Sequence, residues 1–152
     1  MSRAPFQVLV YPYRKRNKGH FEYALMKRAD DGTWQGIAGG GEDGETPFEA
    51  AIRETHEEAG LSPASEFIRL DSIESVPAAG FRDSHIWGEN VYVIPQHSFG
   101  VAAHNAPITI SHEHTEYKWF TYEEACRLIK YDGSRTALWE LDKRLKGKGP
   151  RG

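Results

Sequence analysis

Residues 39–61 read GGGEDGETPFEAAIRETHEEAGL, a glycine-rich turn that runs into an acidic helix. Thr46 is a good N-cap, Pro47 suits the first helical position, and Glu49 completes a capping box. Gly60 supplies the left-handed residue that commonly ends a helix. The sequence therefore predicts a helix over residues 47–59, with a glycine loop directly before it.

Two glutamates of this helix follow a third at three and four positions. Glu54, Glu57 and Glu58 therefore project from one face, where Glu54 repels each of the other two by roughly 0.2–0.5 kcal/mol. Arg53 lies four positions before Glu57 and relieves part of this repulsion. A divalent cation would relieve the rest. Carboxylate oxygens suit Mg²⁺, with Mn²⁺ as the alternative, better than zinc. The competing interpretation is a solvated charged face without a ligand.

The other positions of the helix predict which side packs on the core. The expected buried stripe consists of Phe48, Ala51, Ile52, Thr55 and Ala59. The carboxylates then fall largely off the core side, towards the loop 39–44. Glycines there let the backbone approach a ligand closely, so Gly39 and Gly40 are candidates for substrate binding.

Together these residues resemble the signature of the Nudix hydrolase family. The positions that the signature fixes to one residue type are all present, namely Gly39, Glu45, Arg53, Glu54, Glu57, Glu58 and Gly60. Thr55 stands where a larger aliphatic residue is usual. The resemblance implies an α/β fold, an α/β/α sandwich around a central mixed sheet. It also implies a metal-dependent attack of water on a nucleoside diphosphate linked to another group.

Within this resemblance, Glu54, Glu57 and Glu58 are the expected catalytic and metal-binding residues, with Arg53 as a catalytic residue that fixes the carboxylates. We expect Glu45 to stabilise the junction between loop and helix. The main-chain carbonyl of Ala38 is a further expected metal ligand.

A second motif reads Glu113-His-Thr-Glu-Tyr-Lys-Trp119. Several branches of the family carry a glutamate just before the last strand, and Glu113 matches that position as an additional metal ligand. Glu116 is the competing candidate, but its place beside Tyr117 fits the start of a strand better. The histidines of this region have no zinc-ligand spacing, and we expect loop positions for His97, His104, His112 and His114.

Candidate substrate contacts lie on both sides of the helix. Residues 77–87 lack periodicity, and long irregular segments are often binding loops, so Phe81 and Arg82 are candidates for contacts with a base or phosphate. Arg28 and Trp34 lie before the glycine loop and are further candidates. The alternative interpretations are a surface loop pinned by aromatics and, for Trp34, a core position.

Alternating strands and helices are predicted along the rest of the chain, without an internal repeat. The expected strands are 6–13, 21–28, 34–38, 66–76, 90–95 and 117–120. The expected helices after the acidic one run from Thr121 to near Asp132-Gly133 and over 135–145. We expect one domain over 1–145 and a basic flexible tail over 146–152.

Composition narrows the functional classes. The formal net charge of −3 argues against nucleic-acid binding through a general basic surface. No apolar run is long enough for a membrane span and no signal-peptide pattern is present, so we expect a cytoplasmic protein. The single cysteine, Cys126, is expected to be a small buried hydrophobe. Monomer and homodimer both remain open.

The substrate is expected to be a small-molecule nucleotide. Resemblances around Trp34-Gln35 and Tyr117-Lys-Trp119 favour a nucleoside or pterin triphosphate, cleaved to a monophosphate and pyrophosphate. Dinucleoside polyphosphates such as diadenosine tetraphosphate and ADP-ribose are the alternatives. A sensor without catalysis is disfavoured, because such domains generally lose carboxylates that are present here.

Overall fold

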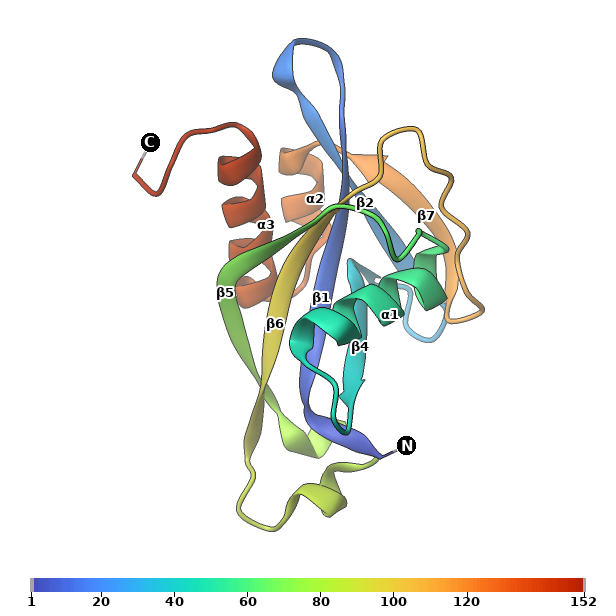
Figure 1. Ribbon diagram of the computed structural model, residues 1–152, viewed down its shortest axis with the longest axis vertical. Helices are drawn as coiled ribbons and strands as arrows, with labels where there is room; N and C mark the ends of the chain where they lie inside the picture. The colour runs from blue at the N-terminus through green and yellow to red at the C-terminus, as the bar shows by residue number, and fades with distance from the viewer. Residues whose placement is uncertain (1, 152) are drawn as a thin grey trace.

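The computed structural model describes residues 2–151. Its described part contains a seven-stranded sheet in the order β3-β2-β1-β6-β5, with β4 paired to β1 and β7 paired to β2 (Figure 1). The strands are β1 Arg3–Lys15, β2 Phe21–Arg28, β3 Trp34–Gln35, β4 Ile37–Glu42, β5 Phe67–Pro77, β6 Val93–Ala102 and β7 His114–Phe120. The helices are α1 Pro47–Ala59, α2 Tyr122–Leu128 and α3 Asp132–Leu145. All neighbours are antiparallel except β1 and β6, so the sheet is mixed.

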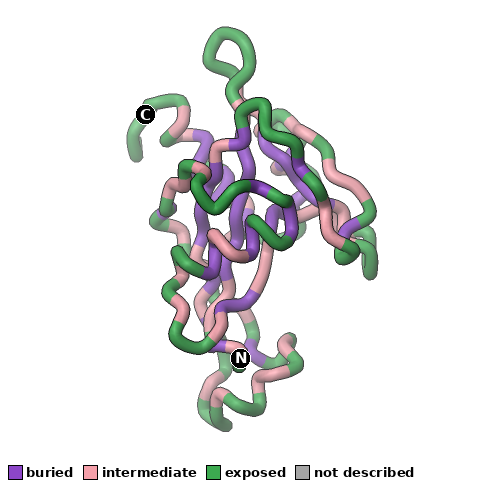
Figure 2. The backbone as a smooth tube through the Cα atoms, turned by 45° about the vertical axis from the view of Figure 1, so that its right-hand side comes forward, coloured by how far each residue is buried: buried purple, intermediate pink, exposed green. Residues whose placement is uncertain are grey.

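Two apolar clusters form, one on each face of the sheet, because side chains alternate along β1. Val8 and Val10 pack on the face that α1 covers, together with Ala51 of that helix. Leu9 and Tyr11 pack on the opposite face with Leu138 of α3. Figure 2 shows the buried residues concentrated in the central strands. The predicted α/β/α sandwich around a mixed sheet is thus confirmed.

Helix α1 begins and ends where the sequence predicts. Both hydrogen bonds of the capping box are present, and Gly60 ends the helix at φ 69°. The predicted stripe was partly wrong: Phe48 is 45% exposed and Ile52 half-buried, whereas Glu54 and Glu58 are buried. The helix is thus rotated about its axis so that two of the carboxylates lie on its sheet side.

Strand β6 is the largest difference from the prediction, which placed a strand over 90–95. The observed strand is Val93–Ala102, and its second half is buried. Gln96, His97, Ser98 and Gly100 break the apolar alternation that marks a strand in a sequence. Long-range pairing with β1, from Gln7↔Gln96 to Tyr13↔Ala102, forms the strand nevertheless.

Other boundaries also differ. The glycine loop is mostly strand β4, and Gly36 separates it from β3, so the predicted single strand 34–38 is divided. Helix α2 ends at Leu128 because Ile129 has extended dihedrals and makes a β-bridge with Trp34. Asp132-Gly133 therefore begins α3 instead of ending α2. The domain boundary predicted at 145 stays a prediction.

Predictions for three single residues were also wrong. Cys126 is only half-buried, although it packs against the core cluster that includes Tyr11. His114 is not in a loop: it is buried as the first residue of β7, and His97 lies inside β6. Among residues 2–151, no helix is long and apolar enough to cross a membrane.

Candidate active site

Helix α1 lies close against β4 because of a glycine. A Cβ atom at Gly39 would overlap the carboxyl group of Glu54, so this carboxylate rests on the strand backbone next to Ala38. Glycine is the residue that permits this approach of side chain to backbone. The predicted role of Gly39 in substrate contact stays a prediction, whereas its role in seating Glu54 is visible.

Arg53 connects the helix to the loop that precedes it. Its guanidinium donates two hydrogen bonds to the Glu45 carboxylate, Nε to Oε2 at 2.7 Å and Nη2 to Oε1 at 3.0 Å. Nη1 donates to Glu54 Oε1 at 2.9 Å and to Glu57 Oε2 at 3.3 Å, and Nη2 also donates to the carbonyl of Gly40 at 2.9 Å. One cation thus orders three carboxylates. Glu45 also accepts from the backbone N–H of Glu42, as expected of a residue that stabilises this junction.

Glu54 is held in an environment that disfavours its charge. Burial raises its pKa to about 7, and the neighbouring charges of Glu57 and Glu58 act in the same direction against the opposing effect of Arg53. Near neutral pH the carboxyl group is therefore close to half-protonated. A nearby cation would favour its ionised form.

Glu58 contacts Ser111, which precedes β7, and His114, the first residue of β7. Ser111 Oγ donates to Glu58 Oε2 at 2.5 Å, and His114 Nδ1 lies 3.5 Å from the same oxygen. Burial lowers the pKa of His114, so its ring is neutral at pH 7. Neither ring nitrogen has a hydrogen-bond partner among the described residues, although both are buried. The sequence motif that begins at Glu113 includes His114, whereas no pattern in the sequence indicated a role for Ser111.

The carboxylates fit a divalent metal by their chemistry, although they do not converge on one point. Within residues 2–151, no three His, Cys, Asp or Glu side chains are gathered closely enough to hold an ion. Glu54 and Glu57 turn to Arg53, whereas Glu58 turns to Ser111. The buried carboxylate oxygens and the raised pKa of Glu54 are nevertheless features that a hard cation would satisfy.

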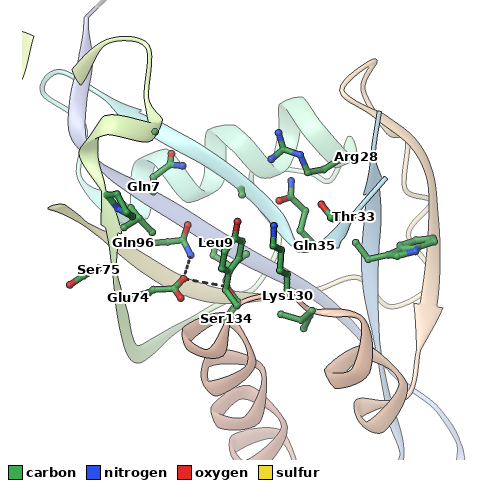
Figure 3. Close-up of a pocket in the computed structure, with 18 of the residues that line it drawn as sticks. Gln7, Leu9, Arg28, Thr33, Gln35, Glu74, Ser75, Gln96, Lys130 and Ser134 are labelled. Carbon is green, nitrogen blue, oxygen red and sulfur yellow. Dashed lines mark hydrogen bonds between the residues drawn. The ribbon is translucent and has the colours of Figure 1, made fainter. Parts of the chain in front are cut away.

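A cavity of about 400 Å³ lies on the opposite face of the sheet from α1, between the ends of β5 and β6 and the start of α3 (Figure 3). Of the predicted substrate contacts, Arg28, Trp34 and Phe81 line it, whereas Arg82 is exposed and does not. Trp34 packs edge-on against Phe120 at 5.3 Å between ring centroids. The cavity volume of about 400 Å³ is typical of a small-molecule site.

A second, polar cleft of about 330 Å³ adjoins this cavity. Arg28, Gln35 and Ala38 line both spaces, so the two are direct neighbours. The cleft also contains Glu113 and His114, and His114 contacts Glu58. The structure therefore brings Glu113 and Ala38 to one cleft at the edge of the carboxylate helix. Their roles as metal ligands stay predictions.

Several cavity residues were missed from the sequence. Gln7, Glu74, Gln96 and Ser134 come from three strands and a helix and meet only through the sheet pairing. Gly40, a predicted substrate contact, does not line the cavity. A Cβ atom there would overlap the guanidinium of Arg3, so the glycine makes room for that side chain.

An acidic helix face beside a polar cleft and a ligand-sized cavity defines a class of hydrolases that act on phosphorylated small molecules. Comparison with known proteins is more specific: the NUDIX domain family model matches residues 5–140. The chain therefore belongs to the Nudix family. It is a Nudix hydrolase, an enzyme that cleaves phosphoric anhydride bonds. Enzymes of this family generally use divalent metal ions and act on small-molecule nucleotides.

Two curated relatives and one solved structure show the extent of the similarity. The asymmetrical bis(5'-nucleosyl)-tetraphosphatase of Mus musculus is 31% identical over 130 residues, covering 83% of this chain and 82% of the relative. Dihydroneopterin triphosphate diphosphatase of Escherichia coli strain K12 is 29% identical over 138 residues, covering 90% and 91%. A crystal structure described as a NUDIX hydrolase from Listeria monocytogenes is 38% identical, with a TM-score of 0.85 over 95% of this chain and 96% of that one.

The raised pKa of Glu54 predicts how stability depends on pH. A carboxyl whose pKa is raised from 4.5 to about 7 stabilises the fold below pH 4.5 and loses that contribution as pH rises through 7. In EDTA at pH 8, Glu54→Gln should therefore raise the free energy of unfolding by about 2–3 kcal/mol, and by almost nothing at pH 4. Urea unfolding at both pH values measures this. Glu89→Gln, on an exposed loop, is the control; equal effects of Glu54→Gln at both pH values would refute the assignment.

Proposed function

We propose that this protein is a Mg²⁺-dependent pyrophosphohydrolase that cleaves a nucleoside or pterin triphosphate to the monophosphate and pyrophosphate. The observation that carries this proposal is that the two spaces are neighbours. One cavity of about 400 Å³ with aromatic residues on its walls adjoins a polar cleft, and His114 on the cleft wall lies 3.5 Å from the helix carboxylate Glu58. This arrangement suits a ligand with one heterocycle and one polyphosphate chain.

In this arrangement the heterocycle occupies the cavity, beside Trp34 and Phe81. The phosphates lie along the cleft, where Arg28 is the cation common to both spaces. Arg28 is also paired with Asp30 at 2.8 Å, so its position is fixed. The reacting phosphates then lie on the side of the cleft nearest α1, where His114 of the cleft wall is 3.5 Å from Glu58.

The residues that would hold Mg²⁺ are Glu54, Glu57, Glu58 and Glu113, with the carbonyl of Ala38. When bound, the metal neutralises phosphate oxygens and makes hydroxide available near neutral pH. Arg53 keeps Glu54 and Glu57 in place through its hydrogen bonds. One of the three helix glutamates accepts the proton of the attacking water, and all three remain candidates for that role.

The named relatives support two substrate classes. The dihydroneopterin triphosphate diphosphatase matches over 90% of this chain and favours a triphosphate. The mouse tetraphosphatase is 31% identical and favours dinucleoside polyphosphates as the second candidate. We favour the triphosphate because the adjoining cleft is lined mainly by charged and polar residues, which suit phosphates better than a second base.

Removing a charge from the helix should abolish most of the activity. Glu57→Gln and Glu58→Gln should each lower turnover by a factor on the order of 10³, because each removes an anionic metal ligand while the side-chain volume is kept. Steady-state release of pyrophosphate with Mg²⁺ measures this. Glu123→Gln, on the exposed side of α2, is the control. Turnover close to wild type in either helix variant would remove that residue from the site.

The two glutamates around β7 provide a matched comparison. Glu113 lines the polar cleft, whereas Glu116 lies within β7 opposite Lys27, with its carboxylate 3.5 Å from Lys118 Nζ. Glu113→Gln should therefore lower activity or raise the Mg²⁺ concentration needed for half-maximal rate, and Glu116→Gln should change neither. The reverse pattern would assign the fourth carboxylate to Glu116.

A substrate panel tests the proposed reaction directly. The protein is incubated with Mg²⁺ and dATP, dGTP, dihydroneopterin triphosphate or diadenosine tetraphosphate, and the products are separated by chromatography. We expect a monophosphate and pyrophosphate from at least one triphosphate. Efficient conversion of the dinucleotide to ATP and AMP, with all triphosphates intact, would reject the proposal in favour of the second candidate.

A further inference from the structure

Neighbouring strands place a row of polar positions across the sheet at the cavity. Gln7 of β1 is in register with Gly40 of β4 on one side and with Gln96 of β6 on the other. Gln96 is in turn in register with Glu74 of β5. Residues in register on neighbouring strands project from the same face with Cβ atoms about 5 Å apart. Gln7, Gln96 and Glu74 all line the cavity (Figure 3).

At the β4 end of the row, Arg3 fixes the orientation of the Gln7 amide. The guanidinium of Arg3 lies in the space that Gly40 leaves, and Arg3 Nη2 donates to Gln7 Oε1 at 3.1 Å. Phe81 faces the same guanidinium, 5.6 Å from its ring centroid. Because an arginine can only donate, the amide oxygen of Gln7 is used and its Nε2 group remains as a donor.

At the β5 end of the row, Glu74 fixes the Gln96 amide, here by accepting from its nitrogen and leaving its oxygen available. Gln96 Nε2 donates to Glu74 Oε1 at 3.0 Å, and Ser134 Oγ donates to the same oxygen at 3.3 Å. Gly133 makes room for the Glu74 carboxylate at the start of α3. Gln96 is only 7% exposed, and its Oε1 remains as an acceptor, turned away from Glu74 in Figure 3.

The middle of the row therefore presents one donor beside one acceptor. Neither Gln7 Nε2 nor Gln96 Oε1 has a partner among the described residues. Arg3 and Glu74 carry opposite charges at the two ends, and each prevents the adjacent amide from turning over. Two glutamines without these neighbours could each offer either atom, and the site would then select no particular ligand edge.

We infer that Gln7 and Gln96 are the specificity-determining residues of the cavity. They bind a flat heterocycle whose edge carries an N–H group next to a hydrogen-bond acceptor atom. The amidine edge of adenine and the lactam edge of guanine or a pterin both have this pattern. The N–H donates to Gln96 Oε1, and the acceptor atom receives Gln7 Nε2–H. Arg3 and Glu74 are positioning residues that act through the two amides. This inference rests on the proposed function.

The expected selectivity follows from the burial of Gln96. A ligand that lacks the N–H leaves the Gln96 oxygen desolvated and unpaired, and sites built in this way reject such analogues strongly. We expect the protein to bind the parent heterocycle on the order of 10- to 100-fold more tightly than its analogue methylated at that N–H.

Equilibrium binding of nucleoside monophosphates tests the inference without relying on turnover. Binding of dAMP, dGMP and dihydroneopterin monophosphate is measured by calorimetry, together with analogues whose N–H is removed by methylation: N6,N6-dimethyl for adenine, N1-methyl for guanine and N3-methyl for the pterin. The proteins compared are wild type, Gln7→Met, Gln96→Met and Glu74→Gln, with Glu123→Gln as the control. Glu123 is exposed on α2 and does not line the cavity. Competition by pyrophosphate reports on the phosphate side of the site.

The readout is the ratio of affinities for parent and methylated ligand, which a lower folded fraction would not change. We expect a ratio of at least 10 in wild type and in Glu123→Gln. It should fall towards 1 in Gln96→Met and fall partly in Glu74→Gln, with pyrophosphate affinity unchanged. Gln7→Met should weaken the binding of parent and methylated ligand alike, because Gln7 pairs with the acceptor atom. A wild-type ratio near 1 for every heterocycle, a retained ratio in Gln96→Met, or unchanged affinities in Gln7→Met would overturn the inference. Selective binding without triphosphate hydrolysis would instead reject only the proposed function.

Discussion

The ion pairs of Arg53 are the interaction on which the site depends. A single guanidinium spans the glycine strand, the loop and the helix through Gly40, Glu45 and Glu54. Arginine is suited to this because its planar fork donates in several fixed directions and stays charged. Because these contacts are only partly exposed, they are screened by salt less than surface pairs would be. Without Arg53 the acidic face would have no internal cation to hold it in order.

The same arrangement leaves the site electrostatically unbalanced. Glu45, Glu54 and Glu57 share one arginine, and burial together with the charges of Glu57 and Glu58 raises the pKa of Glu54 to about 7. A site with surplus negative charge repels a free polyphosphate, so the substrate is expected to enter together with its cation. The disfavoured charge of Glu54 is thus a local stability cost that ligand binding would offset.

Local signals predicted the ends of α1, the bounds of β2 and the capped start of α2, and they failed where long-range pairing decides the structure. Thr46, Pro47, Glu49 and Gly60 define the helix ends through contacts within a few residues, so the sequence alone contains the necessary information. The second half of β6 is stabilised by pairing with a strand far away in the chain, and its polar residues carry no strand pattern. The cavity residues Gln7, Gln96 and Glu74 become neighbours only through that register. The family signature identified the carboxylates because they are close in sequence. It did not identify Ser111, Gln7 or Gln96, because each of these lies far along the chain from the residues it meets in the fold.

The parallel pairing of β1 with β6 has a consequence for how the enzyme forms. Its register joins residues about 90 positions apart, whereas β1 meets β2 and β4 over much shorter separations. Closing so long a loop is entropically unfavourable, and contacts of this kind slow folding. The cavity floor is therefore expected to assemble after the helix and the early strands. During synthesis on the ribosome, the carboxylate helix emerges well before β6, so ligand recognition is completed only when most of the chain has been made.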